Sequence, residues 1–445
     1  MPYQGGLFWH CVSAILPALV MIPKNLDPQD KIMIRMRLLI RLGWSCALII
    51  VLLACTALGT PTPNFDQTAT ADWATQNHIC CTAAIPQIST ATSSPPQNNS
   101  NIVLYRGNPQ RTGVYDVEAI RHQPEVKWQT TINDTWLMPP MLADGILYTG
   151  SGDGTLYALN AETGEQIWSA GGFDALESTG AIAGDRIVTA GFSNLVQALD
   201  RKTGDLLWSF KTRNFAQGAP LIVAGTVYLA TDHAVYALSL DSGQLIWETA
   251  TGKEGAFMGP PAYDEGVIYT TGGKLLLALE AETGKELWRV ENDQMFLGLA
   301  VANGHVYVGN WDRRLYAFEQ STGEERWSFE AGGEFWSEPA VTDEVVYAGN
   351  IDSFIYALNA QTGDVIWSYE TGGDAVSGPV VADGVVYVSD SAHLFSTGPR
   401  HLYALDATTG EELWMFESMS TFLPAPAPGE GVIYITSAGE VIALE

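Results

Sequence analysis

Apolar and polar residues alternate along most of this chain in short runs that end at turn-forming residues, which is the pattern of β-strands. One unit shows the pattern clearly. Residues 356–359 form an extended apolar run, Thr362 and Gly363 supply a tight turn, and residues 365–367 return as a second strand. Gly363 suits the turn because glycine adopts positive φ angles without steric cost. The unit is therefore predicted to be a β-hairpin.

The same hairpin occurs seven times, each time with a tryptophan four residues after the turn glycine and ten residues after an alanine. Successive tryptophans are 40, 39, 41, 39, 40 and 47 residues apart. A period near 40 with several short strands per unit is typical of β-propeller blades. In the sixth unit the expected strands cover residues 338–342, 345–349, 354–359 and 365–369. No unit has a convincing helix pattern, so the predicted fold class is all-β.

Each end of the chain carries an incomplete unit. The last unit stops at Glu445, two residues after Ala443, so it lacks its tryptophan strand. Residues 125–128 form a strand that ends in Trp128 and has no turn of its own. Joining the two fragments completes an eighth blade and leaves no free sheet edge. We therefore predict an eight-bladed β-propeller over residues 102–445, closed by pairing of the N-terminal strand in the last blade.

The repeated motif, Ala-x-(Asn/Asp)-x-x-Thr-Gly-x-x-x-Trp, resembles the tryptophan-docking repeat of the pyrroloquinoline-quinone-like (PQQ-like) propeller family. The resemblance covers the chain after Ile102, and residues 105–113 also resemble the leader segment of many bacterial members. That family contains quinoprotein alcohol dehydrogenases and non-catalytic lipoproteins of the BamB type. The resemblance implies that each repeat tryptophan docks its indole against the adjacent blade. The blade-docking residues are Trp128, Trp168, Trp208, Trp247, Trp288, Trp327, Trp367 and Trp414.

Residues 33–55 have the features of an export signal. A basic region with three arginines precedes an apolar stretch of 13 residues, which is short for a membrane span. The stretch ends in Leu-Leu-Ala-Cys, which resembles a bacterial lipobox. Cys55 is then the expected lipidation site and the mature N-terminus. The alternative is an uncleaved membrane anchor.

Two further segments flank this signal. Residues 1–32 are either a start-site artefact or an extra apolar segment. Residues 56–101 are rich in Thr, Ala, Ser, Pro, Gln and Asn and almost uncharged, which is the composition of a disordered tether. The propeller is therefore expected in the cell envelope, anchored to a membrane on the extracytoplasmic side.

The charge composition of the chain limits the classes of molecule that it can bind. The formal net charge is −28, with 50 acidic against 22 basic residues, which opposes binding to nucleic-acid phosphates. None of the five cysteines lies in the predicted propeller, so no disulfide supports its fold. Quinoprotein alcohol dehydrogenases carry a vicinal cysteine disulfide in their propeller. Here the adjacent pair Cys80 and Cys81 lies in the tether, where we interpret it as a coincidence or a redox-labile pair.

Signs of an enzyme are weak, and the interpretation leans towards a non-enzyme. The resemblance to quinoproteins implies a stacking tryptophan, a Ca²⁺ site and a catalytic aspartate, and none can be matched residue by residue. The motifs of serine hydrolases, P-loop proteins and paired-histidine metal sites are also missing. We expect no catalytic residue, metal or cofactor, with PQQ and Ca²⁺ as the alternative. The acidic residues between the second and third strands are interpreted as turn formers rather than metal ligands; they are Asp153, Asp232, Asp312, Asp352 and Asp390.

Aromatic residues cluster just before the predicted innermost strands, which begin at the mouth of the central channel. We expect them to ring that mouth, although apolar side chains more often plug or pack a core. A seven-residue excess in the seventh unit, within residues 389–402, projects from the same face, either as a binding loop or as a tolerated insertion. The candidate binding rim consists of Trp136, Phe257, Phe296, Phe335, Trp336, Phe422, His393, Phe395, Arg400 and His401.

Together these features predict an exported, membrane-tethered, monomeric propeller. Its expected role is that of a non-catalytic scaffold that binds a protein or peptide across the channel-mouth face. One alternative is a PQQ-dependent oxidoreductase. The other is a sensor that binds a small molecule or a glycan on the aromatic rim.

Overall fold

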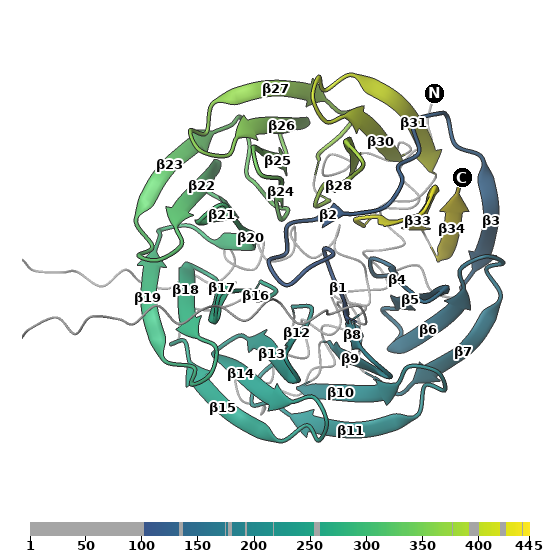
Figure 1. Ribbon diagram of the computed structural model, residues 1–445, viewed down its shortest axis with the longest axis vertical. Helices are drawn as coiled ribbons and strands as arrows, with labels where there is room; N and C mark the ends of the chain where they lie inside the picture. The colour runs from purple at the N-terminus through teal and green to yellow at the C-terminus, as the bar shows by residue number, and fades with distance from the viewer. Residues whose placement is uncertain are drawn as a thin grey trace, which may run out of the picture. The chain divides into compact units, whose positions relative to one another are not determined.

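In the computed structural model, the described residues contain 34 β-strands in eight separate sheets, arranged as blades around a central axis (Figure 1). The all-β, eight-bladed fold is confirmed, and the described residues contain no helix that could cross a membrane. The segments 1–32, 33–55 (with Cys55) and 56–101 lie outside the described residues. The structure describes residues 102–132, 137–173, 175–176, 180–191, 194–216, 218–252, 259–375, 377–390, 400–418, 424–437 and 439–445.

Blades 1 to 4 each contain four consecutive strands, ordered from the axis outwards. Blade 1 has β4 (Met141–Ala143), β5 (Ile146–Gly150), β6 (Thr155–Asn160) and β7 (Gln166–Gly171). Blade 2 has β8 (Ala181–Ala183), β9 (Arg186–Ala190), β10 (Leu195–Asp200) and β11 (Leu206–Lys211). Blade 3 has β12 (Leu221–Val223), β13 (Thr226–Thr231), β14 (Ala234–Ser239) and β15 (Leu245–Ala250). Blade 4 has β16 (Ala262–Asp264), β17 (Val267–Gly272), β18 (Leu275–Glu280) and β19 (Glu286–Glu291).

Blades 5 to 7 follow the same order. Blade 5 has β20 (Phe296–Ala302), β21 (His305–Asn310), β22 (Arg314–Glu319) and β23 (Glu325–Glu330). Blade 6 has β24 (Ala340–Val341), β25 (Val345–Gly349), β26 (Phe354–Asn359) and β27 (Val365–Glu370). Blade 7 has β28 (Val380–Ala382), β29 (Val385–Ser389), β30 (Arg400–Asp406) and β31 (Glu412–Ser418).

Both ends of the chain build blade 8. Its three inner strands are β32 (Ala427–Gly429), β33 (Val432–Ser437) and β34 (Glu440–Leu444), and its outermost strand is β3 (Val126–Thr131). Trp128 of β3 lies opposite Ala443 of β34 in an antiparallel ladder. The amide of Glu125 donates to the carbonyl of Glu445 at 2.9 Å, and the amide of Glu445 donates back at 3.0 Å. The predicted closure of the ring by its two ends is confirmed.

Burial explains why the strands have their composition. In blade 6, four of the five residues of β25 are buried, because the strand is covered on both faces by neighbouring blades. The outermost strand β27 is buried mainly at Trp367. Val365 and Ile366, which precede that tryptophan, are about half exposed at 49% and 48%. The continuous apolar runs of the sequence are thus the inner strands, and the tryptophan strands form the outer wall.

All eight repeat tryptophans dock against the next blade. Each indole Nε1–H donates to a backbone carbonyl of that blade at 2.8–3.1 Å. The indole also lies on the turn glycine: Gly363 has φ +75°, and a Cβ there would lie 2.6 Å from Cε3 of Trp327. In order from Trp128 to Trp414, the acceptors are Ala161, Arg201, Leu240, Ala281, Gln320, Ala360, Ala407 and Ile120.

A tyrosine reinforces seven of these eight junctions, which the sequence analysis missed. In blade 6, the hydroxyl of Tyr347 donates to the carbonyl of Ala407, the same oxygen that accepts from Trp367. Burial raises the pKa of Tyr347 to about 12, so the hydroxyl keeps its proton at neutral pH. In blade 2, Val188 stands opposite Ala198 where the other blades have the tyrosine. The other six tyrosines are Tyr148, Tyr228, Tyr269, Tyr307, Tyr387 and Tyr434.

Candidate functional site

Half of the candidate rim lies outside the described residues, namely Trp136, Phe257, Phe422, His393 and Phe395. Among the rest, three side chains are packed inside the ring, which is the alternative that the sequence left open. Phe296 and Phe335 are fully buried, and Arg400 is only 3% exposed. Trp336 and His401 are partly exposed.

The three buried side chains have clear physical reasons. Phe296 begins β20, pairs with Asn310 and packs edge-on against Tyr316 and Phe318. Phe335 packs between blades 5 and 6 in the cluster that contains Val341 and Val346. Arg400 begins β30 opposite Ser418, and burial lowers its guanidinium pKa. These three side chains are packed inside the ring, so they cannot contact a ligand in this arrangement.

The leader, residues 102–115, crosses the ring axis and joins six blades. Its first strand, β1 (Ile102–Leu104), extends the sheet of blade 2, and β2 (Val114–Tyr115) extends that of blade 7 (Figure 1). Between them, backbone carbonyls of the leader accept from amides of the innermost strands. The donors are Tyr263 of blade 4, Val301 of blade 5 and Val341 of blade 6.

Two buried arginines fix the leader to the blades. Arg111 donates from Nε to the carbonyl of Pro261, from Nη1 to Tyr105 and from Nη2 to Ala219 and Pro220, at 2.6–3.0 Å. Arg106 donates from Nη2 to the carbonyls of Pro339 and Pro379, at 2.7 and 3.0 Å. Each arginine is 1% exposed, and burial lowers the pKa of Arg111 to about 10. Each arginine side chain therefore links the leader to two neighbouring blades through hydrogen bonds.

Beside the leader, a cavity of about 220 Å³ remains where it faces blades 1 and 8. Leu104 and Tyr115 of the leader, Met141 of β4 and Ala427 of β32 contribute to its walls. The leader therefore fills the axis unevenly, with close contact to blades 2 to 7 and a gap towards blades 1 and 8.

The channel-mouth face is the side of the ring where each outermost strand leads into the innermost strand of the next blade. On this face, Trp311 from the β21–β22 turn stacks on Trp336 from the β23–β24 loop. Their ring centroids are 5.6 Å apart, and their planes differ by 22°. Both side chains are partly exposed. Nε1 of Trp336 donates to Oε2 of Glu334 at 2.6 Å.

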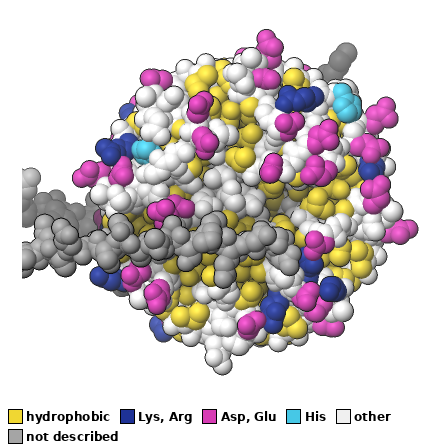
Figure 2. Space-filling model, in the orientation of Figure 1, with side chains coloured by type: hydrophobic (Ala, Val, Ile, Leu, Met, Phe, Trp, Pro, Cys, Tyr) yellow, Lys and Arg dark blue, Asp and Glu magenta, His cyan; other side chains and the backbone are white. Residues whose placement is uncertain are grey.

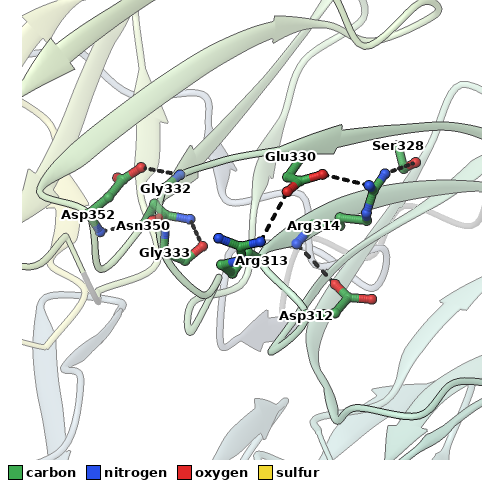
Figure 3. A network of polar contacts seen from close by, with 9 residues as sticks. All are labelled: Asp312, Arg313, Arg314, Ser328, Glu330, Gly332, Gly333, Asn350 and Asp352. Carbon is green, nitrogen blue, oxygen red and sulfur yellow. Dashed lines mark hydrogen bonds and ion pairs between the residues drawn. The ribbon is translucent and has the colours of Figure 1, made fainter.

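A network of polar contacts holds the loop that carries Trp336 (Figure 3). The amide of Gly332 donates to Oδ2 of Asp352 at 2.8 Å. Asn350 accepts from the amide of Gly333 at 3.1 Å and donates to its carbonyl at 2.8 Å. A Cβ on Gly333 would lie 2.7 Å from Cγ1 of Ile351, so this close approach requires glycine. The loop is consequently ordered before any ligand arrives.

Next to the turn that carries Trp311, ion pairs connect the start of β22 to the end of β23. Glu330 accepts from Nη2 of Arg313 at 3.2 Å and from Nη2 of Arg314 at 2.6 Å (Figure 3). Asp312 and Asp352 each accept from a backbone amide of their own turn, and also from the hydroxyl of a tyrosine on the following strand. The structure thus shows turn-forming roles for these two aspartates.

In blade 7, Asp390 occupies the corresponding place. It is 2% exposed, and its Oδ2 contacts Nδ1 of His401 at 2.9 Å and accepts from Tyr403 at 3.1 Å. Among the described residues, no three His, Cys, Asp or Glu side chains converge on a metal position.

Comparison with known proteins places this arrangement in context. A family model described as outer membrane protein assembly factor BamB matches residues 110–256, 231–334, 274–387 and 375–445. BamB of Yersinia pestis is 28% identical over 234 residues, which cover 48% of this chain and 58% of that protein. The match thus spans less than two thirds of the relative's own length.

Solved structures share the fold. The crystal structure of BamB from Moraxella catarrhalis superposes with a TM-score of 0.58 at 19% identity, over 72% of this chain and 99% of that one. The quinohemoprotein alcohol dehydrogenase from Comamonas testosteroni gives a TM-score of 0.65 at 13% identity, over 77% and 80% of the two chains. At these identities the likeness is one of fold alone.

Proposed function

Because the chain belongs to the family described as outer membrane protein assembly factor BamB, we propose that its ring is a non-catalytic scaffold that binds a protein or peptide through the channel-mouth face. The Trp311–Trp336 stack carries the proposal, since two large aromatic side chains are partly exposed there. Tryptophan is among the residues that dominate the binding energy of protein interfaces. The loop around Trp336 is already hydrogen-bonded, so binding costs little additional conformational entropy.

The proposed location is the cell envelope, with Cys55 as the acylated N-terminus. The name of the Yersinia relative, an outer membrane protein assembly factor, and the lipobox-like sequence support this proposal. Cys55→Ser is expected to move the protein from the membrane fraction to the soluble fraction. Unchanged membrane retention would instead support an uncleaved anchor.

Site-specific photo-crosslinking in cells tests the scaffold role. Trp336 is replaced with p-benzoylphenylalanine, which preserves an aromatic side chain at the centre of the proposed face. Irradiation is expected to yield a crosslink to one discrete polypeptide, because the partner must lie within reach of the stack. The same amino acid at Leu207 is the control, since that residue is 47% exposed on the outer wall of blade 2.

The comparison between the two positions decides the outcome. A protein adduct from position 336 and none from position 207 supports the channel-mouth face as the docking surface. Equal adducts from both positions would contradict it, as would the lack of any protein adduct from position 336.

A further inference from the structure

We propose that the Trp311–Trp336 stack binds a positively charged side chain, lysine or arginine, presented by the partner segment. The inference rests on the proposed function, because it specifies the chemistry of the segment that the scaffold binds. It depends on three features of the described residues: the aromatic faces, the carboxylates around them and the hydrogen bonds that those carboxylates already make.

The stack offers indole faces whose electron density attracts cations. Cations favour tryptophan over the other aromatic side chains when they lie within about 6 Å of the ring. In Trp336, the Nε1–H donates to the carboxylate of Glu334 at 2.6 Å, which further polarises the indole towards its ring face. The backbone amide of Trp311 donates to the carbonyl of Met295 at 3.0 Å, which fixes the other half of the stack.

Several oxygens of the nearby carboxylates already accept hydrogen bonds from donors within the protein. Oδ1 of Asp312 accepts from the amide of Arg314, and Oδ2 accepts from the hydroxyl of Tyr316. In the same way, Asp352 accepts from Phe354 and Tyr356, and also from Gly332. These groups therefore act on a ligand mainly through their negative field rather than through new directional bonds.

Because the carboxylates offer a negative field but few free acceptor positions, the site favours a cationic ligand over a sugar. A saccharide stacked on tryptophan also needs acceptors and donors aimed at its hydroxyl groups, and buried polar groups without partners are costly. A lysine or arginine side chain needs only the ring face and a negative field, and its stem packs on the apolar surface. The internal pairing of Glu334, Asp312 and Asp352 leaves the field in place and reduces the hydrogen-bonding capacity.

The neighbouring arginines are outnumbered by carboxylates, because Arg313 and Arg314 share Glu330 and three more acidic side chains belong to the same or adjoining loops, namely Asp312, Glu334 and Asp352. Arg313 and Arg314 both pair with Glu330, at 3.2 and 2.6 Å. Residues 102–445 contain 46 acidic and 17 basic residues. Acidic side chains are also distributed widely over the face of the ring drawn in Figure 2. This charge attracts a basic segment from a distance, and the stack then selects where its side chain binds.

Calorimetry with defined peptides tests the proposal on the purified full chain. The probe is acetyl-Gly-Lys-Gly-Lys-Gly-amide, together with versions in which arginine, norleucine or citrulline replaces both lysines. The lysine and arginine peptides are expected to bind at least tenfold more tightly than their neutral counterparts. Norleucine keeps the apolar stem and citrulline keeps most of the shape of arginine, so the comparison isolates the charge.

Matched variants separate the stack from the general negative charge. Trp336→Leu, with every charge intact, is expected to weaken binding about 3- to 30-fold, the range that a cation–π contact supplies. Glu334→Gln keeps an acceptor for the indole and should reduce both the affinity and its dependence on salt. Phe210→Leu removes another partly exposed aromatic side chain, in blade 2, and should leave the affinity unchanged.

Equal binding of the lysine and norleucine peptides would overturn the proposal, as would unchanged binding by Trp336→Leu. Selective binding of an oligosaccharide that Trp336→Leu abolishes would overturn it in favour of a glycan. If the crosslink from position 336 persists while basic peptides fail, the scaffold role stands and only the cationic chemistry is wrong. If the crosslink also fails, the proposed function fails with it.

Discussion

Replacing Arg111 with methionine should lower the free energy of unfolding of the propeller by about 4 kcal/mol or more, because several buried carbonyl oxygens lose their donor. The guanidinium satisfies four carbonyl oxygens, those of Tyr105, Ala219, Pro220 and Pro261. Methionine fills much of the space but donates no hydrogen bond. The carbonyls then remain buried without donors, at a cost of about 1–3 kcal/mol for each such group.

Urea unfolding measures this effect as a lower midpoint at an unchanged slope. Arg121→Met is the control, because the Arg121 side chain is 48% exposed and its ion pair with Asp383 spans 3.8 Å. Exposed pairs of this kind contribute about 0–1 kcal/mol. Similar urea midpoints for the two variants would show that the hydrogen bonds of Arg111 do not hold the leader to the blades.

Replacing Gly363 with alanine should destabilise the ring by about 2–5 kcal/mol, through two separate effects. The backbone φ is +75°, which costs an L-residue about 1–2 kcal/mol. The added Cβ would also lie 2.6 Å from Cε3 of Trp327, and overpacking of this kind costs about 1–3 kcal/mol. The indole would be displaced from the junction between blades 5 and 6.

Gly225→Ala is a matched control for the second effect. Gly225 has φ +79°, almost the same as Gly363, but a Cβ there would meet no atom within 4 Å. Its replacement should therefore cost only the backbone strain. Thermal or urea unfolding measures how much each variant loses in free energy of unfolding, and the difference between the two losses is the cost of the indole contact. If the two alanines cost the same, the indole contact does not determine the turn glycine.

The blade count and the closure could be predicted because both rest on local signals. A turn glycine and a tryptophan four residues later lie on the same hairpin, and the structure explains the pair physically. The glycine of one blade is needed where the indole of the previous blade lies on it, as Gly363 is by Trp327. The unmatched strand at Trp128 then required a partner, which β34 supplies.

The path of the leader could not be predicted in the same way. Arg106 and Arg111 bind carbonyls between 108 and 273 positions away in sequence, and no local pattern encodes such contacts. In the sequence, two arginines in a short segment do not indicate any particular structure. Their role becomes apparent only in the fold, where both side chains bind carbonyls of residues next to the innermost strands. Both also have positive φ angles, of 62° and 60°, which a sequence reading does not assign to arginine.

The candidate rim could be predicted only in part, because the sequence does not say which of its aromatic side chains are exposed and which are buried. Phe335 and Trp336 are adjacent in the β23–β24 loop, and their residue types do not say which of the two side chains is exposed. The structure buries Phe335 and leaves Trp336 partly exposed. Trp311 was missed altogether, although a signal existed: it occupies a turn position where blade 6 has Ile351.

The account depends on a ring sealed by its own two ends, since the leader, the rim loops and the stack all take their positions from neighbouring blades. Disulfide crosslinking tests this most directly. Thr131→Cys and Glu440→Cys place cysteines directly opposite in the β3–β34 ladder, with the five native cysteines replaced by serine. The control combines Thr131→Cys with Leu195→Cys, in blade 2. We expect mild oxidation to join 131 to 440 within one chain and to leave the control pair reduced. Failure of 131 and 440 to join, or equal joining in the control, would contradict the sealed ring.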